Sequence, residues 1–254
     1  MRPWSAETFA EQISPTFIEN WPAALHDLSI RTLDLEVPEA ELHAAVSYTR
    51  YRSWFHNLRP FQNLDGLRDR LERGLATFPD GAFLRLGSRS PKDAHYAYEV
   101  GMRVRSAADG LALLTTHSRR IAFDIRCALD YSYLPRLFLR EWLTLPAWTE
   151  FRCFVEEGRL VGISQYDHRY LGSAPEIHRH APAIEDSIRR FFEQIRPLLH
   201  LPSVIVDVFL DPVAAAEGRF ETRLLELNPF IVQTSPAMFS WTREGDFDGS
   251  FRYL

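Results

Sequence analysis

The sequence Leu-Leu-Glu-Leu-Asn-Pro-Phe at residues 224–230 carries the most specific local pattern in the chain. Its polar and apolar side chains alternate, as is typical of a strand with one buried face. Because residues two apart in a strand share a face, we expect Glu226 and Asn228 to project together and Leu225 and Leu227 to point into the core. The pattern therefore predicts a strand that presents a carboxylate and an amide side by side.

A second predicted strand, Val-Ile-Val-Asp-Val-Phe at residues 204–209, holds one carboxylate in an otherwise apolar run. An ionised Asp207 buried there alone would be costly, so it needs a charged partner or a metal ion. If the two strands form a hairpin, Asp207, Glu226 and Asn228 converge as half of a ligand shell for a hard cation such as magnesium. The alternative stays open that both carboxylates pair with arginines and that Asn228 caps a turn beside Pro229.

Basic side chains in apolar segments are the second feature that bears on function. Lys92 is the only lysine among the 29 lysine and arginine residues. A GC-rich coding bias would explain why lysine is so rare. Alternatively, the compact ammonium group of Lys92 binds a phosphate oxygen. Arg85 and Arg152 lie within apolar, aromatic-rich strands, where each taken singly could instead form a salt bridge. Because a magnesium-nucleotide site needs cations for the phosphates and oxygen ligands for the metal, the two sets together favour such a site.

The order of the predicted elements indicates an α+β protein with mostly antiparallel sheets and flanking helices. Helices are expected at residues 38–51, 64–75, 111–129 and 183–199, and strands at 30–35, 82–86, 137–142, 150–155, 160–166, 204–210 and 221–228. The change of character near residue 138 predicts two lobes, 1–138 with a helical start and a phosphate-contacting loop, and 139–254 with the metal-binding strands. A site between two lobes is a common place for a ligand.

In the same order along the chain, several segments resemble the cell division cycle protein 123 family, whose fold is ATP-grasp. The matching segments are Phe83–Leu86 with Ser90–Ala94, Leu139–Trp142, Glu150–Val155, Leu160–Gln165, Asp207–Val208, Glu226–Phe230 and Phe239–Trp241. No single motif is decisive, but their combination is specific. The arginine-rich composition suggests a bacterial member of this family.

The resemblance implies an ATP-grasp-like protein that holds ATP between two lobes, with basic side chains on the phosphates, an inter-lobe hinge at the adenine edge and oxygen ligands on Mg²⁺. The corresponding residues here are Arg85, Lys92 and Arg152 for the phosphates, Leu139, Arg140, Glu141 and Trp142 for the hinge, and Asp207, Glu226 and Asn228 for magnesium. Family members often have Asp where this chain has Glu226, which is a chemically compatible change.

The resemblance leaves the reaction open, and no catalytic residue is identified. The first hypothesis is an ATP-dependent ligase-type activity of the ATP-grasp class on an unknown second substrate. The alternative is an ATP-regulated assembly factor or chaperone that binds a protein partner without turnover. In a third hypothesis, the chain is a binder that has lost magnesium chemistry, and the carboxylates serve only as structural ion-pair partners. Eukaryotic members assemble translation initiation factor 2, but we find no match to their N-terminal region or acidic C-terminal extension, which puts that partner in doubt.

The sequence argues against several other classes of protein. The chain has no P-loop and no dinucleotide-binding glycine motif, and no apolar run approaches the ~20 residues that span a bilayer. Its net charge of −5 argues against general nucleic-acid binding, although a local RNA contact stays open. The two cysteines fit a reduced, cytoplasmic setting. The spacing of His178 and His180 does not predict a zinc site, and no hydrolase triad is evident.

Overall fold

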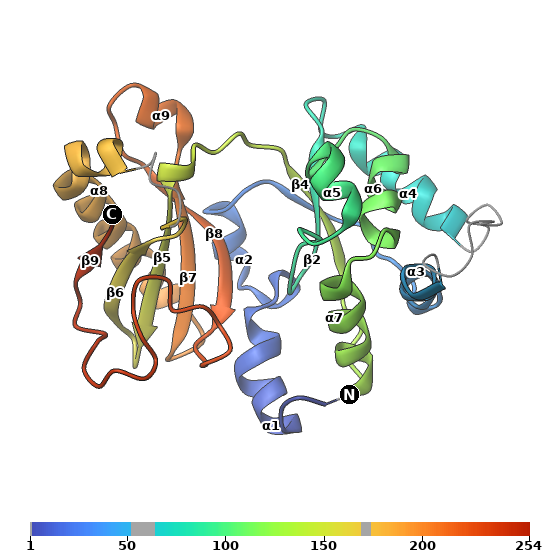
Figure 1. Cartoon of the computed structure of the whole chain (residues 1–254), viewed down its shortest axis with the longest axis horizontal. Coiled ribbons are helices and arrows are strands. Elements are labelled where there is room, and N and C mark those ends of the chain that lie inside the picture. The colour runs from blue at the N-terminus through green and yellow to red at the C-terminus, as the bar shows by residue number, and fades with distance from the viewer. Residues whose placement is uncertain (1, 52–63, 169–173) are drawn as a thin grey trace. The chain divides into compact units, whose positions relative to one another are not determined.

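The computed structural model describes residues 2–51, 64–168 and 174–254 (Figure 1). The chain forms two compact units, each with its own sheet. Unit 1 comprises Met1–Phe9 and Arg31–Trp142, and unit 2 comprises Ala10–Ile30 and Leu143–Leu254. The chain therefore passes into unit 2 early, returns to unit 1 at Arg31 and leaves it after Trp142.

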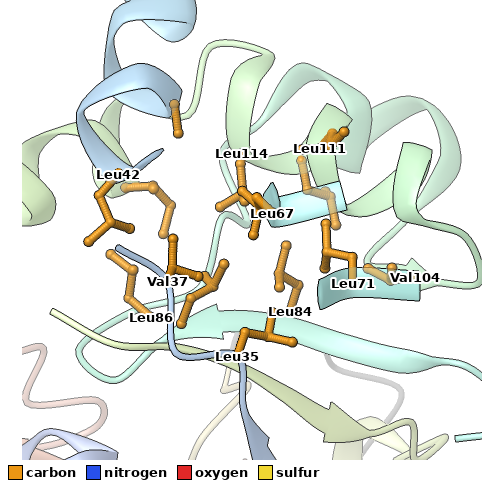
Figure 2. Packing of buried hydrophobic residues seen from close by; sticks show 14 of the residues in the cluster. Leu35, Val37, Leu42, Leu67, Leu71, Leu84, Leu86, Val104, Leu111 and Leu114 are labelled. Carbon is orange, nitrogen blue, oxygen red and sulfur yellow. The ribbon is translucent and has the colours of Figure 1, made fainter. Parts of the chain in front are cut away.

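Unit 1 contains a four-stranded antiparallel sheet in the order β1-β4-β2-β3. Its strands are β1 (Thr32–Asp34), β2 (Ala82–Leu86), β3 (Arg103–Val104) and β4 (Leu137–Glu141), and its helices are α1 (Ala6–Thr8), α3 (Glu39–Tyr51), α4 (Asp65–Leu75), α5 (His95–Val100), α6 (Ala107–Thr115) and α7 (Arg119–Asp130). Figure 2 shows the core, in which leucines of α4 and α6 pack on those of β2. The apolar face of the strand and the apolar faces of the helices therefore pack together in one layer.

The two faces of this sheet differ in chemistry. Leu84 and Leu86 of β2 and Leu139 of β4 are fully buried in the core. Because side chains alternate along a strand, Arg85 and Arg140 occupy the opposite face, and both are buried. The register places Arg85 opposite Phe138, so each arginine has an aromatic or polar neighbour rather than a leucine.

The single long helix expected over residues 111–129 is wrong, because the chain forms two helices there. Helix α6 ends at Thr115 and α7 begins at Arg119. Between them His117 has φ of 60°, in the left-handed region, which a helix does not continue through. The Ser118 hydroxyl then accepts a hydrogen bond from the Ile121 N–H and caps the new helix.

Unit 2 contains a five-stranded sheet in the order β8-β7-β5-β6-β9. Its strands are β5 (Glu150–Glu156), β6 (Arg159–Gln165), β7 (Val204–Leu210), β8 (Thr222–Pro229) and β9 (Phe251–Arg252), and its helices are α2 (Ala23–Asp27), α8 (Ala174–Ile195) and α9 (Pro212–Ala216). All neighbouring strands are antiparallel except β6 and β9. The expected α+β class with mostly antiparallel sheets is confirmed.

Helix α8 is longer at its N-terminal end than the sequence predicts. It begins at Ala174 and includes Pro182, whereas the prediction began at residue 183. Proline lacks an N–H and usually marks a boundary, so a proline inside a helix hides the preceding turns from sequence reading. No helix among the described residues is long and apolar enough to cross a membrane.

Strand β8 departs from simple alternation. Strand β8 has a β-bulge opposite the step from Asp207 to Val208 on β7. Asp207 pairs with Glu226, but Val208 pairs with Leu224. Leu225 is the extra residue, and it is only half-buried, whereas Leu224 and Leu227 are buried. The expectation that Leu225 points into the core is therefore wrong, because the bulge shifts the face of the preceding residues.

Candidate functional site

The centre of the candidate site is an ion pair across two strands of unit 2. Arg152 on β5 is directly opposite Asp207 on β7. Arg152 Nε and Nη2 each donate to one carboxylate oxygen of Asp207, both at 2.7 Å. Asp207 is completely buried and Arg152 nearly so. Two-point, charge-assisted pairs of this kind are stronger and more specific in geometry than a single neutral hydrogen bond.

Two further side chains of β8 complete the carboxylate cluster. The Asn228 amide nitrogen donates to Asp207 Oδ2 at 2.9 Å and lies 3.4 Å from Glu226 Oε1. Glu226 is the register partner of Asp207, and both Glu226 and Asn228 are half-buried. The structure therefore brings together the three residues that the sequence groups as magnesium ligands, and it also pairs Asp207 with an arginine, as the alternative expected.

The third guanidinium nitrogen connects the cluster to a loop. Arg152 Nη1 donates to the backbone carbonyl of Ser235 at 2.8 Å. The Arg152 guanidinium also lies 5.1 Å from the ring centre of Tyr166, at the end of β6. Sequence reasoning missed both contacts. Tyr166 could have been found from its alternation with Ser164, but the Ser235 carbonyl has no side-chain signal.

Burial and charge shift the acidity of this cluster. Burial raises the pKa of Asp207 to about 6, the Arg152 charge and hydrogen bonds oppose this, and the Glu226 carboxyl adds to it. Burial alone would lower the pKa of Arg152, but the Asp207 carboxylate raises it above the ordinary value. The pKa of Tyr166 is raised by burial and by both carboxylates. Arg152 therefore stays positively charged, and the Asp207 and Glu226 carboxyls each make it less favourable for the other to ionise.

The donor set fits a hard cation in composition. The Asp207 and Glu226 carboxylates both lie beside the Asn228 amide nitrogen, and turning this amide over would present its oxygen to the same site instead. Arg152 competes for the same Asp207 oxygens. Across residues 2–51, 64–168 and 174–254, no three His, Cys, Asp or Glu side chains gather closely enough to hold a metal ion. Magnesium binding stays a prediction that depends on the amide as third ligand.

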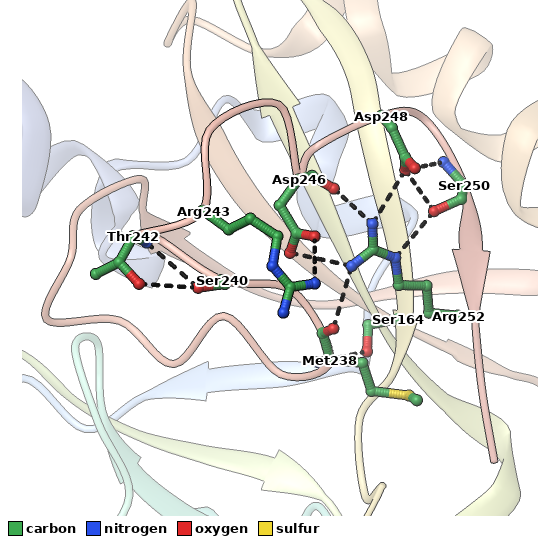
Figure 3. A network of polar contacts seen from close by, with 9 residues as sticks. All are labelled: Ser164, Met238, Ser240, Thr242, Arg243, Asp246, Asp248, Ser250 and Arg252. Atoms are coloured by element: carbon green, nitrogen blue, oxygen red, sulfur yellow. Dashed lines mark hydrogen bonds and ion pairs between the residues drawn. The ribbon is translucent and has the colours of Figure 1, made fainter.

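The loop that carries Ser235 is held by a second arginine network (Figure 3). Arg252 of β9 donates to Asp246 Oδ2 at 3.0 Å, to the Asp246 carbonyl at 2.6 Å and to the Met238 carbonyl at 3.3 Å. Its guanidinium also lies 3.9 Å from the ring centre of Phe239. The Met238 N–H donates to the Ser164 hydroxyl on β6. These contacts fix the loop over the face of the sheet that carries Arg152.

The remaining predicted residues lie in unit 1. Arg85 is buried and donates to the Leu86 carbonyl at 3.0 Å, and Lys92 is exposed in the loop after β2. Leu139 is a core residue, whereas Arg140 is buried on the opposite face and donates to the Thr32 hydroxyl at 3.2 Å. The Glu141 and Trp142 N–H groups donate to the carbonyls of Arg31 and Gly81. Their nucleotide contacts stay predictions.

Three comparisons with known proteins extend this description. The model of the family described as D123 matches residues 40–244. Cell division cycle protein 123 of Phaeosphaeria nodorum is 30% identical over 168 residues, which cover 62% of this chain and 42% of that protein. The translation initiation factor eIF2 assembly protein of Xenopus tropicalis is 30% identical over 182 residues, which cover 68% of this chain and 52% of that protein.

A solved structure shares the fold. The structure of Cdc123 from Schizosaccharomyces pombe superposes with a TM-score of 0.73 at 20% identity, covering 95% of this chain and 92% of that chain. The chain spans about half the length of the curated relatives it matches. These relatives are eukaryotic, so the comparisons do not bear out the bacterial origin suggested by composition.

Proposed function

Because this chain belongs to the D123 family of cell division cycle protein 123, we propose that it is an assembly factor that binds a protein partner. The family match over residues 40–244 is the observation that carries the proposal. Several relatives are named translation initiation factor eIF2 assembly proteins. These names favour the assembly alternative over a ligase-type activity, and they make eIF2 or a protein related to it the first partner to test.

The test of the assembly role is binding of the purified chain to purified eIF2 and its separate subunits, measured by calorimetry. We expect saturable binding to one subunit, and faster formation of the complete complex when the chain is present. Bovine serum albumin and an unrelated protein complex serve as controls. Absence of binding to every subunit, with the chain shown to be folded, would contradict the proposal.

We further propose that the Arg152–Asp207 cluster belongs to a Mg-ATP site that supports this role. Asp207, Glu226 and Asn228 would hold the ion, and Arg152 would orient the Asp207 carboxylate through its two hydrogen bonds. When bound, magnesium would neutralise phosphate charge. From the family resemblance, Arg85, Lys92 and Arg152 would contact the phosphates and residues 139–142 the adenine edge.

Nucleotide binding is tested by calorimetry with ATP, adenosine and no metal. We expect Mg²⁺-dependent ATP binding that Asn228→Ala weakens, whereas Glu217→Gln, at a 59% exposed carboxylate of unit 2, leaves it unchanged. Lys92→Ala should weaken binding of ATP more than of adenosine, because adenosine lacks the phosphates. Product analysis then separates the two hypotheses: no turnover favours the assembly factor, and ADP formation with an acceptor favours the ligase. No ATP binding at millimolar concentration would overturn the nucleotide proposal and leave the assembly role untouched.

A further inference from the structure

The outer face of helix α7, in unit 1, carries exposed arginines. Ile121 and Ile125 of this helix are buried in the core, whereas Arg119 and Arg126 are exposed. Residues seven apart in a helix return to the same side, so Arg119 and Arg126 project together, about 10 Å apart along the helix axis. Phe123 lies between them on this side and is only half-buried.

These arginines differ from most exposed arginines of the chain, which pair with a carboxylate. Arg190 pairs with Asp186, for example, and Arg219 with Glu217. Among residues 2–51, 64–168 and 174–254, the guanidinium groups of Arg119, Arg120 and Arg126 form no ion pair and no hydrogen bond. The outer face of α7 therefore presents cations whose charge no described residue neutralises by direct contact.

The carboxylates closest to these arginines along the helix do not change this. Asp124 lies 3.3 Å from Arg89 Nε, and Asp93 accepts hydrogen bonds from the Ser118 hydroxyl at 2.7 Å and from the N–H of residue 120 at 3.0 Å. Asp130 follows Arg126 by one turn, but no ion pair joins the two. Three arginines thus stand against one exposed carboxylate on the outer side of the helix.

The charges along α7 also run against the helix macrodipole. Its first turn contains no acidic residue and its last turn no basic residue. Arg119 and Arg120 instead begin the helix, and Asp130 ends it. Cations are unfavourable at the N-terminal end of a helix and anions at its C-terminal end. The stability of the helix therefore gives no reason for these arginines, whereas binding of an anionic partner does.

We propose that this face of α7 binds an acidic amphipathic helix of a protein partner. Two carboxylates seven residues apart on such a helix have the separation of Arg119 and Arg126, and an apolar side chain midway between them meets Phe123. Same-face side chains of an extended segment recur about every 7 Å, so they match this separation less well. The inference rests on the proposed function in taking the partner to be a protein, and it adds the chemistry of the segment that is recognised.

A nucleic acid fits this face less well than an acidic helix. Asp130 lies on the same side, one turn beyond Arg126, and would face the continuous charge of a phosphate backbone. The net charge of −5 opposes a polyanion as well. A protein helix can place carboxylates opposite the arginines alone, so charge complementarity favours it.

The test uses labelled synthetic peptides and fluorescence anisotropy at low salt. The probe is a helical Ala/Gln peptide with two Glu residues seven apart and one Leu midway between them. The comparison probes are the same peptide with both Glu→Gln, with Leu→Ser, with the two Glu moved to opposite sides of the helix, and a single-stranded RNA. We expect the first peptide to bind most tightly and its affinity to fall as salt is raised. Tighter binding of the RNA, or equal binding of the peptide with Glu on opposite sides, would overturn the proposal.

Variants of the full chain locate the binding on α7. Arg119→Gln with Arg126→Gln should weaken peptide binding about threefold to tenfold, because two exposed ion pairs are lost. Phe123→Ala should reduce the advantage of the Leu peptide over the Ser peptide. Arg73→Gln is the matched control, since Arg73 is an exposed arginine on helix α4 of the same unit and pairs with no other described residue. An equal loss in Arg73→Gln, or none in the double variant, would overturn the proposal.

Two further measurements separate binding from folding. The double variant should melt no lower than wild type, because neither arginine has a partner in the fold; a clearly lower melting temperature would give the arginines a structural role and contradict the inference. Arg126→Glu should prefer a peptide in which one Glu is replaced by Lys, which reverses the pair. A chain that binds eIF2 but not the acidic peptide would overturn this inference alone, whereas loss of both would also contradict the proposed function.

Discussion

Arg152 and Asp207 face each other across β5 and β7 and are joined by two hydrogen bonds of 2.7 Å in the interior of unit 2. Such a pair is weak support for stability as a whole, because desolvation offsets the attraction, but each partner becomes costly without the other. The same arginine holds the Ser235 carbonyl, so the pair connects the sheet to the loop after β8. Its energetic role can be measured.

Removing one partner of this pair should destabilise the protein strongly. We expect Arg152→Met to lower the free energy of unfolding by about 3–5 kcal/mol, because it leaves Asp207 buried without its cation. Arg152→Met with Asp207→Leu should cost clearly less than the sum of the single changes. Urea unfolding of the three variants measures this, with Arg219→Met at a 61% exposed position as the control. Additive losses would show that the two residues do not act as a pair.

Stability should depend on pH through Asp207. Burial raises its folded-state pKa to about 6, above the ordinary value of 3.8 for a free carboxyl. A raised folded-state pKa means that the native state holds the proton more tightly, so this contribution is complete below about pH 4 and is lost as pH rises through 6. A shift of about two units corresponds to about 3 kcal/mol. The difference in unfolding free energy between wild type and Asp207→Asn should therefore fall from pH 4 to pH 7, whereas parallel curves would contradict this assignment.

A side chain at Gly162 should destabilise the protein. A Cβ atom there would lie 2.6 Å from the Phe239 ring, which packs with Phe154 and Ile205 in a separate small core. We expect Gly162→Ala to destabilise the protein by about 1–3 kcal/mol through overpacking. Phe239→Leu should recover part of that loss in the double variant. Thermal unfolding measures both, and Gly158→Ala, with open space around its Cβ but a positive φ of 72°, reports backbone strain alone.

Arg252 should hold the loop that carries Ser235. Arg252 is 21% exposed and makes several hydrogen bonds to the loop, whereas its neighbour in Figure 3, Arg243, is 75% exposed and pairs only with Asp246 in the drawn network. We expect Arg252→Ala to cost about 1–3 kcal/mol and Arg243→Ala no more than about 0.5 kcal/mol. Hydrogen exchange should show increased opening of residues 235–250 in Arg252→Ala only. Equal protection in the two variants would mean that Arg252 does not anchor the loop.

Several elements could be predicted because their signals are local. Strands β2, β5, β6 and β7 follow from runs of apolar and aromatic residues, and the turn between β5 and β6 follows from Glu157-Gly158, both of which have positive φ. Strands β3 and β9 have two residues each, too few to show a period. The helix predicted from residue 183 misses the first turns of α8 because Pro182 lies inside that helix, and the break between α6 and α7 has no glycine or proline to mark it.

The sequence by itself determined the α+β class and the shared face of Glu226 and Asn228, because period-two alternation acts between neighbours in the chain. It also indicated that Asp207 needs a partner, since a lone buried carboxylate is costly. Only the tertiary structure decided that the partner is Arg152, through the register of β5 with β7. The bulge that brings Asp207 opposite Glu226, and the return of the Ser235 carbonyl to Arg152, were also decided there. These depend on contacts between residues far apart in the chain, for which a single sequence contains no local signal.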